Sequence, residues 1–205
     1  MESAPRNTSR GRPRKFDKDA VLGLIVNVFW EKGYSGTSLD DLAAATSLSR
    51  PSLYAAYGNK LSMYLGALEM FGQRMATEAV GVLVTGPDLP TGLENFYEAA
   101  LDIYLGKNEE MAKGCLVFTT AVTEATNEPA IKAMVQAQLA GMDQAVKAHI
   151  AKRAPDADPA ATAAAAELAA GTLLNLATRA RAGTPREKLT EVAHATATTI
   201  STLLR

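Results

Sequence analysis

From residue 17 onward, the apolar residues of this chain recur every three or four positions, which is the spacing of one face of an α-helix. The first run of this kind consists of Val21, Leu24, Ile25, Val28 and Phe29. The same spacing continues almost to the C-terminus, and we find no pattern typical of a strand. The chain is therefore predicted to be an all-α protein of nine helices.

Glycine, proline or polar residues separate the predicted helices and set their bounds. The alanine-rich tract at 160–170 is interpreted as helix, because alanine is the best helix former. The expected helices cover about residues 17–33, 38–46, 49–57, 60–84, 91–105, 115–125, 129–153, 159–181 and 185–204.

Two of these helices are short and closely spaced, and each begins with a recognisable cap. Ser38 and Asp41 have the spacing of a capping box, although Thr37 is an equally good N-cap. Ser49 caps the next helix, and Pro51 falls in its first turn, where a proline is tolerated. Two short helices joined by a tight turn follow the plan of a helix-turn-helix.

The second helix of such a unit can enter the major groove of DNA with its N-terminal residues against the base edges. Arg50 is the one long donor at that tip and can contact guanine O6 and N7, while Ser52 can hydrogen-bond a base or a phosphate. The alternative is that Arg50 is a solvated surface residue and that Tyr54 and Tyr57 only pack. Taken without context, the residues leave both interpretations open.

The net charge of −1 conceals an uneven distribution. Five basic residues and one acid precede Phe16, so residues 1–16 are predicted to form a flexible basic arm. The run Arg10-Gly11-Arg12-Pro13 also resembles the core of an AT-hook, a segment that lays arginines in a narrow minor groove. Loose attraction of the arm to phosphates is the alternative.

The segments Gly33–Ala43 and Leu48–Lys60 resemble the DNA-binding domain of the TetR/AcrR family of transcriptional regulators. The resemblance implies a TetR-like, all-helical repressor with a three-helix DNA-binding domain and a divergent helical body. It implies an arm at 1–16, a helix-turn-helix domain at 17–61, and an effector-binding and dimerisation domain at 62–205. The chain departs from the family at Thr46-Ser47, where Ala-Gly is usual in the turn.

By the same resemblance, the chain binds a palindromic operator in double-stranded DNA as a homodimer and is released by a small-molecule effector. Arg50 is the expected base reader, whereas Thr37, Tyr57 and Lys60 fall where the family mostly contacts phosphate. The position of Tyr57 often packs inward in the family. The full set of expected DNA contacts is Arg12, Arg14, Thr37, Ser38, Arg50, Pro51, Ser52, Tyr54, Tyr57 and Lys60.

The body offers candidates for an effector pocket and for a dimer interface. Residues that could line a pocket, although such residues are core by default, are Phe71, Met75, Tyr97, Tyr104, Cys115, Phe118, Met134, Gln138 and Asn175. The resemblance to the TetR/AcrR family implies that the last two helices form a four-helix bundle across a two-fold axis. Candidate interface residues are Leu168, Thr172, Leu189, Val192, Thr196 and Ile200. The alternative is an internal hairpin packed on its own body.

Cys115 is the only cysteine and follows Lys113-Gly114 at the expected start of a helix. A helix N-terminus and a nearby cation both favour the reactive thiolate. Gly-Cys-Leu at this place is similar to a segment in one branch of the family, in which some members sense electrophiles or oxidants. One hypothesis is therefore a cysteine-based sensing repressor. The other is that Cys115 is a small buried hydrophobe near the pocket.

Several classes of protein are not expected. One cysteine and two histidines leave too few ligands for a zinc site, and no cofactor is predicted. The chain has no nucleophile elbow and no glycine-rich phosphate loop after a strand, so it is not expected to be an enzyme. With no signal peptide and no run of about 18 apolar residues, it is expected to be cytoplasmic and free of membranes. A non-specific DNA-packaging protein would be basic throughout, whereas the excess of basic residues here is confined to residues 1–60.

Overall fold

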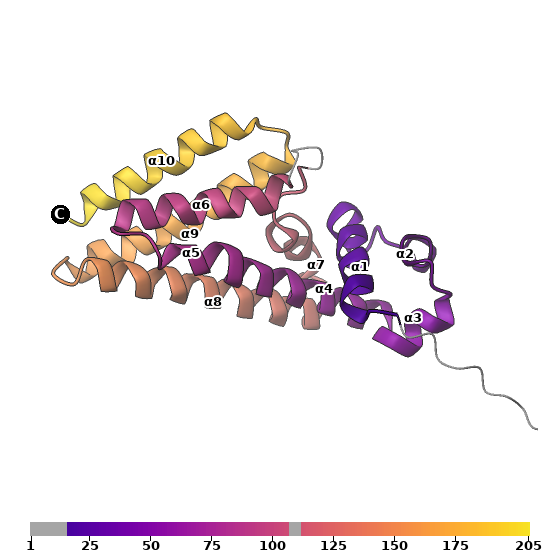
Figure 1. The fold of residues 1–205 in the computed structure, drawn as a ribbon. Helices are drawn as coiled ribbons and strands as arrows, with labels where there is room; N and C mark the ends of the chain where they lie inside the picture. The colour runs from indigo at the N-terminus through magenta and orange to yellow at the C-terminus, as the bar shows by residue number, and fades with distance from the viewer. Residues whose placement is uncertain (1–15, 107–111) are drawn as a thin grey trace, which may run out of the picture.

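The computed structural model describes residues 16–106 and 112–205, which form an elongated molecule (Figure 1). A small head at one end contains α1 (Lys18–Lys32), α2 (Leu39–Thr46) and α3 (Arg50–Tyr57). Every regular element in the described ranges is helical, so the prediction of an all-α fold is confirmed.

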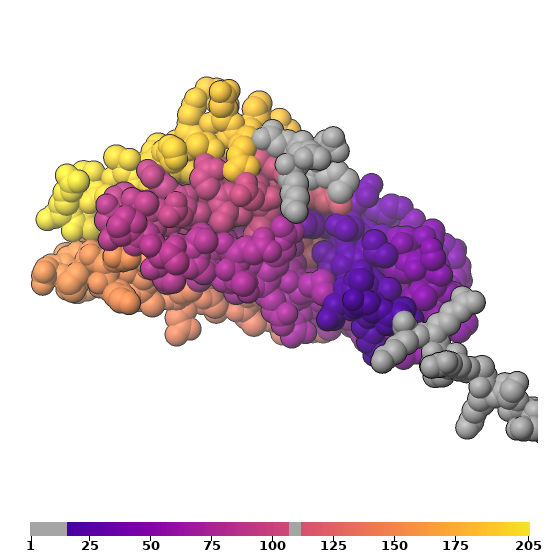
Figure 2. All heavy atoms as spheres, in the orientation of Figure 1, coloured from indigo at the N-terminus to yellow at the C-terminus, as the bar shows by residue number. Residues whose placement is uncertain are grey.

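The body consists of longer helices that extend away from the head. Its elements are α4 (Lys60–Arg74), the π-helical η1 (Met75–Val80), α5 (Gly81–Leu83), α6 (Leu89–Leu105), the π-helical η2 (Val117–Ala121), α7 (Val122–Glu124), α8 (Pro129–Arg153), α9 (Pro159–Arg181) and α10 (Arg186–Leu203). Because α4, η1 and α5 are continuous, as are η2 and α7, the described part contains the nine predicted helical segments. The end of α10 lies at the opposite end of the molecule from the head (Figure 2).

Two details of the helices differ from the prediction. α6 begins at Leu89 rather than near Thr91, because Asp88 accepts a hydrogen bond from the Thr91 N–H (2.9 Å) and Pro90 fits the first turn. The π-helical winding of η1 and η2 was not predicted, since the spacing of apolar residues does not separate it from an α-helix.

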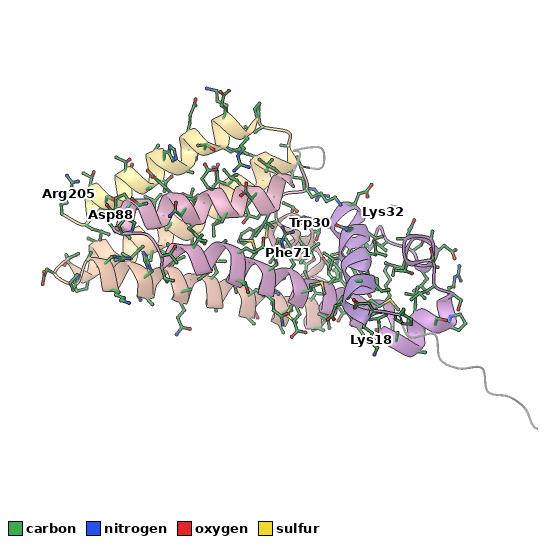
Figure 3. The ribbon with its side chains drawn as sticks, in the orientation of Figure 1. Lys18, Trp30, Lys32, Phe71, Asp88 and Arg205 are labelled. Carbon is green, nitrogen blue, oxygen red and sulfur yellow. The ribbon has the colours of Figure 1, made fainter. Side chains whose placement is uncertain are left out.

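The head is fastened to the body where α1 packs against α4. Phe29 meets Tyr64 and Trp30 meets Phe71, each pair edge to face with ring centroids 4.9 Å apart. Figure 3 shows Trp30 of α1 and Phe71 of α4 at this junction. The Trp30 Nε1–H also donates to the carbonyl of Gly114 at 3.0 Å. Head and body therefore share a packed core.

One helix bears on the expectation about membranes. By length and composition α9 is apolar enough to cross a bilayer, although it contains no unbroken run of 18 apolar residues. Core helices meet the same criterion, and α9 packs against α6, α8 and α10 with Ala165, Ala169 and Leu173 fully buried.

The predicted basic arm, with Arg12 and Arg14, lies outside the described residues except for Phe16. The predicted boundary between residues 61 and 62 falls within the first turn of α4, which contacts α1 in the head and α8 in the body. The division into domains at that point stays a prediction.

Candidate nucleic-acid interface and effector cavity

The start of α2 is fixed by a capping box and by an ion pair with α1. The Ser38 N–H donates to Asp41 Oδ2 (2.8 Å), and the Asp41 N–H donates to Ser38 Oγ (3.1 Å). Lys32 Nζ lies 2.5 Å from Asp41 Oδ1. Hydrogen bonds from Lys32 and then from Ser38 hold the pKa of Asp41 well below its usual range. Asp41 therefore stays charged and ties α2 to the end of α1.

The turn between α2 and α3 contains an unusual backbone conformation. Ser47 has φ 56° and ψ 22°, and it is the only residue other than glycine with positive φ in the described ranges. This is the position at which the sequence departs from the family pattern. Ser49 then caps α3 by accepting from the Ser52 N–H, and Pro51 occupies the first turn as predicted.

The first turns of α3 point a row of side chains into solvent. Arg50, Pro51 and Tyr54 are exposed, Ser52 is half-buried, and Leu53 is fully buried against the head. The Arg50 guanidinium forms a two-pronged ion pair with Asp40 of α2, with Nε 2.8 Å from Oδ1. This partner, which the sequence reasoning missed, raises the pKa of Arg50 and orients it along the exposed face.

At two predicted phosphate contacts, the hydroxyl group donates to a backbone carbonyl within the head. Thr37 is buried, and its Oγ1–H donates to the carbonyl of Gly33 at 2.6 Å. The Tyr57 hydroxyl donates to the carbonyl of Lys18 at 2.8 Å and so joins α3 to α1, consistent with an inward-packing role. Ser38 is exposed at the start of α2, while Lys60 is half-buried with its ammonium 4.6 Å from the Tyr34 ring centroid.

A cavity of about 540 Å³ lies in the body between α4, η1, α6, η2 and α8. Both π-helical segments contribute to its wall, and such segments often occur at functional sites. The structure brings seven of the nine candidate pocket residues together around it: Phe71, Met75, Tyr104, Cys115, Phe118, Met134 and Gln138.

The other two candidates lie elsewhere. Tyr97 is turned toward α9, where its hydroxyl donates to the carbonyl of Ala169 at 3.2 Å, and Asn175 is exposed on α9. Gly72, Val117 and Met142 line the cavity but were missed by the sequence reasoning. No sequence signal separates them from core residues, because their position depends on how the helices pack.

Cys115 lies in the cavity wall and is only 3% exposed. Burial raises the pKa of its thiol to about 12, which outweighs the opposing effect of the Phe118 and Val117 amides. Of the two hypotheses for Cys115, its burial favours the small buried residue beside the pocket. The ammonium of Lys113 does not offset the raised pKa of Cys115, because Lys113 Nζ lies over the Trp30 ring, 5.9 Å from the ring centroid.

A short helical segment joins the cavity wall to the turn before α2. Val117 and Phe118 of η2 line the cavity, and the same segment ends in α7 at Glu124. The Glu124 carboxylate accepts from the Ser35 N–H (3.0 Å) and from the Ser35 Oγ–H (2.7 Å). Beside it, Arg181 of α9 donates to the carbonyls of Trp30 (3.0 Å) and Glu31 (3.1 Å) in the last turn of α1.

The candidate interface residues on α9 and α10 divide into two sets. Leu189 and Ile200 are fully buried and Thr172 is 6% exposed, so they pack within the protomer, which does not support their assignment to a dimer contact. Val192 and Thr196 are half-buried. Leu168 is 40% exposed, and its neighbour Leu174, which the sequence reasoning did not select, is 47% exposed.

The head contains a capped helix pair whose second helix is exposed, and the helical body contains a cavity. This is the architecture of a helix-turn-helix regulator. Residues 22–67 match the family of bacterial regulatory proteins named tetR. The family model and the relatives below support a TetR-family transcriptional regulator, a class of regulators and not of enzymes.

Individual relatives agree with this assignment. The repressor ComR of Escherichia coli is 32% identical over 116 residues, which are 56% of this chain and about half (54%) of ComR. The regulator YezE of Bacillus subtilis is 26% identical, covering 66% of this chain and 69% of YezE. A structure of the TetR family regulator CifR, a cysteine mutant complexed with 26-base-pair double-strand operator DNA, is similar with TM-score 0.81 and 27% identity. That similarity covers 91% of this chain and 98% of CifR.

Proposed function

We propose that this protein is a transcriptional repressor that binds a palindromic operator as a homodimer and releases it when a small molecule fills the body cavity. It would act in the cytoplasm, where the bacterial chromosome lies. The observation that carries the proposal is the N-terminal turn of α3, which exposes Arg50 on a capped helix-turn-helix.

The chemistry of this turn suits the major groove. A guanidinium can donate two hydrogen bonds to guanine O6 and N7, and Ser52 can reach a base or a phosphate. The amides at the start of α3 favour phosphate oxygens. Asp40 holds Arg50 along the surface in the free protein, so base contact requires Arg50 to exchange this carboxylate for the base edge.

Two copies of α3 must be held about one helical turn of DNA apart to read two half-sites. The exposed face of α9, with Leu168 and Leu174, offers an apolar surface that a second copy would cover across a two-fold axis. The CifR complex with operator DNA supports the DNA partner by similarity.

The contacts between body and head supply a route for release. A molecule in the cavity would press on Val117 and Phe118, and η2 and α7 would carry that displacement to Glu124 and Ser35 beside α2. A shift there changes the spacing of the two α3 helices, and a small change in spacing misaligns them with their half-sites.

The test combines footprinting of the DNA upstream of the protein's own gene with light scattering. We expect one discrete protected site with two-fold symmetry, a dimer in solution, and binding that weakens steeply with salt. A monomer, or protection without a discrete site, would contradict the proposal.

Release through covalent modification of Cys115 is the second candidate. Its support is that the thiol lines the cavity, where an electrophile could collect. The raised pKa of the thiol opposes it, because the thiol and not the thiolate is present at neutral pH. Equal operator release by a quinone from wild type and Cys115→Ser would exclude it.

A further inference from the structure

The wall of the cavity in the body has almost no charge. Among its lining residues none is lysine, arginine or histidine, and the one ionisable carboxylate, Glu69, belongs to an exposed residue. An anion that entered would lose its hydration without gaining a cationic partner. The charge of the wall therefore selects against carboxylates, phosphates and sulfates.

The apolar part of the wall is aromatic and rich in thioethers. Phe71 and Phe118 contribute rings, and Met75, Met134 and Met142 come from η1 and α8. Methionine side chains are flexible and polarisable, so they adapt to flat or irregular apolar molecules and contact aromatic rings favourably. The volume of about 540 Å³ lies in the range of small-molecule sites.

One polar group in this wall has no oxygen or nitrogen partner. Tyr104 lines the cavity and is fully buried, and within the described residues its hydroxyl meets only the Cys115 thiol, a weak hydrogen-bond partner. The other two fully buried tyrosines are satisfied, Tyr64 by Thr120 Oγ1 (3.1 Å) and Tyr97 by the carbonyl of Ala169 (3.2 Å). A buried hydroxyl without a partner is costly, and an exception of this kind calls for a ligand or a functional reason.

The neighbouring polar groups do not fill this role. The Cys115 thiol beside Tyr104 is a weak acceptor, and the Gln138 amide, whose Nε2–H donates to the carbonyl of Leu68 at 2.7 Å, makes no hydrogen bond to Tyr104. Burial raises the pKa of Tyr104 well above its usual value, so the hydroxyl remains a neutral donor. What the Tyr104 hydroxyl lacks is a strong neutral acceptor.

We propose that the cavity binds a neutral, mainly apolar organic molecule that places one acceptor oxygen, such as a ketone or ether oxygen, against the Tyr104 hydroxyl. This inference rests on the proposed function, because it names the chemical class of the effector. It excludes organic anions as high-affinity effectors.

Three probes of nearly equal shape separate the contributions of charge and acceptor. 2-Acetylnaphthalene is neutral and has an acceptor, 2-ethylnaphthalene is neutral without one, and 2-naphthoate is an anion. Their binding to the full-length protein is measured by equilibrium dialysis. We expect the ketone to bind at least about tenfold more tightly than the naphthoate, and about threefold to tenfold more tightly than the ethyl compound.

Two variants assign the acceptor contact to Tyr104. Tyr104→Phe should reduce affinity for the ketone about threefold to tenfold and leave affinity for the ethyl compound unchanged. Tyr97→Phe, which removes a buried hydroxyl outside the cavity, is the matched control and should alter neither. Circular dichroism shows whether both variants fold.

The possible results lead to distinct conclusions. Tighter binding of the naphthoate, an equal effect of Tyr104→Phe on all three probes, or no binding of any probe would overturn the inference. Operator retardation with the same protein keeps the proposed function separate. If the ketone binds as expected but leaves the operator bound, the ligand class stands and the effector role fails.

Discussion

The conformation of Ser47 allows a quantitative test of the turn in the helix-turn-helix. Ser47 has φ 56°, is exposed, and makes no side-chain hydrogen bond. A left-handed conformation costs a residue with a side chain about 1–2 kcal/mol. Ser47→Gly removes that cost but adds about 0.4–1 kcal/mol of conformational entropy to the unfolded chain. The middle of these two ranges gives an expected net gain in the free energy of unfolding of about 0.8 kcal/mol.

For a chain of this length, the gain corresponds to a rise in Tm of about 1–4 °C, measurable by thermal unfolding followed by circular dichroism. Ser47→Ala keeps a side chain at the same φ and should stay within about 0.5 kcal/mol of wild type. Gly183→Ala is the converse control, since Gly183 has φ 83° with open space around an added Cβ, and it should lose stability. A Ser47→Gly protein no more stable than Ser47→Ala would refute the assigned turn geometry.

Two further predictions concern the cavity wall and the junction. Burial raises the pKa of Cys115 to about 12, so the rate of alkylation by iodoacetamide should be slow at pH 7 and should still increase with pH at pH 9. A rate that levels off near pH 8.5 would contradict the burial of the thiol. Glu124→Ala removes a negative charge at the junction of body and head, which alone would tighten binding to a polyanion, but it also frees Ser35. We expect Glu124→Ala to bind the operator severalfold more weakly than wild type. Glu78→Ala is the control for the loss of a negative charge. Tighter operator binding by Glu124→Ala would exclude a positioning role for Glu124.

The sequence predicted the helices of the head because their determinants are local. Ser38 with Asp41, Ser49 with Pro51, and the glycines after α1 and α3 act within a few residues of each helix end. Contacts between segments distant in sequence were not predictable in this way. The pairing of Arg50 with Asp40 and the bond from Tyr57 to Lys18 depend on how the three helices meet.

The same difference between local determinants and contacts of distant segments explains which features of the body were predictable. The periodicity of apolar residues identified α9 and α10, but it does not show which face of each helix is covered within one protomer. Leu189 and Ile200 were therefore assigned to the dimer interface, although they pack inside the protomer. Cys115 shows the same limit for electrostatics. Its local surroundings favour a thiolate, yet burial by residues far away in the sequence dominates its pKa.

The most direct test of sequence-specific DNA binding is selection of bound fragments from random double-stranded DNA, at one salt concentration, with wild type, Arg50→Ala and Lys60→Ala. Wild type should enrich an inverted repeat whose half-sites lie about one helical turn apart. Arg50→Ala should lose the preference at one base pair in each half-site, whereas Lys60→Ala should retain the sequence and bind all DNA more weakly. Enrichment of no sequence by wild type, or of a sequence without two-fold symmetry, would contradict recognition by a dimer through α3.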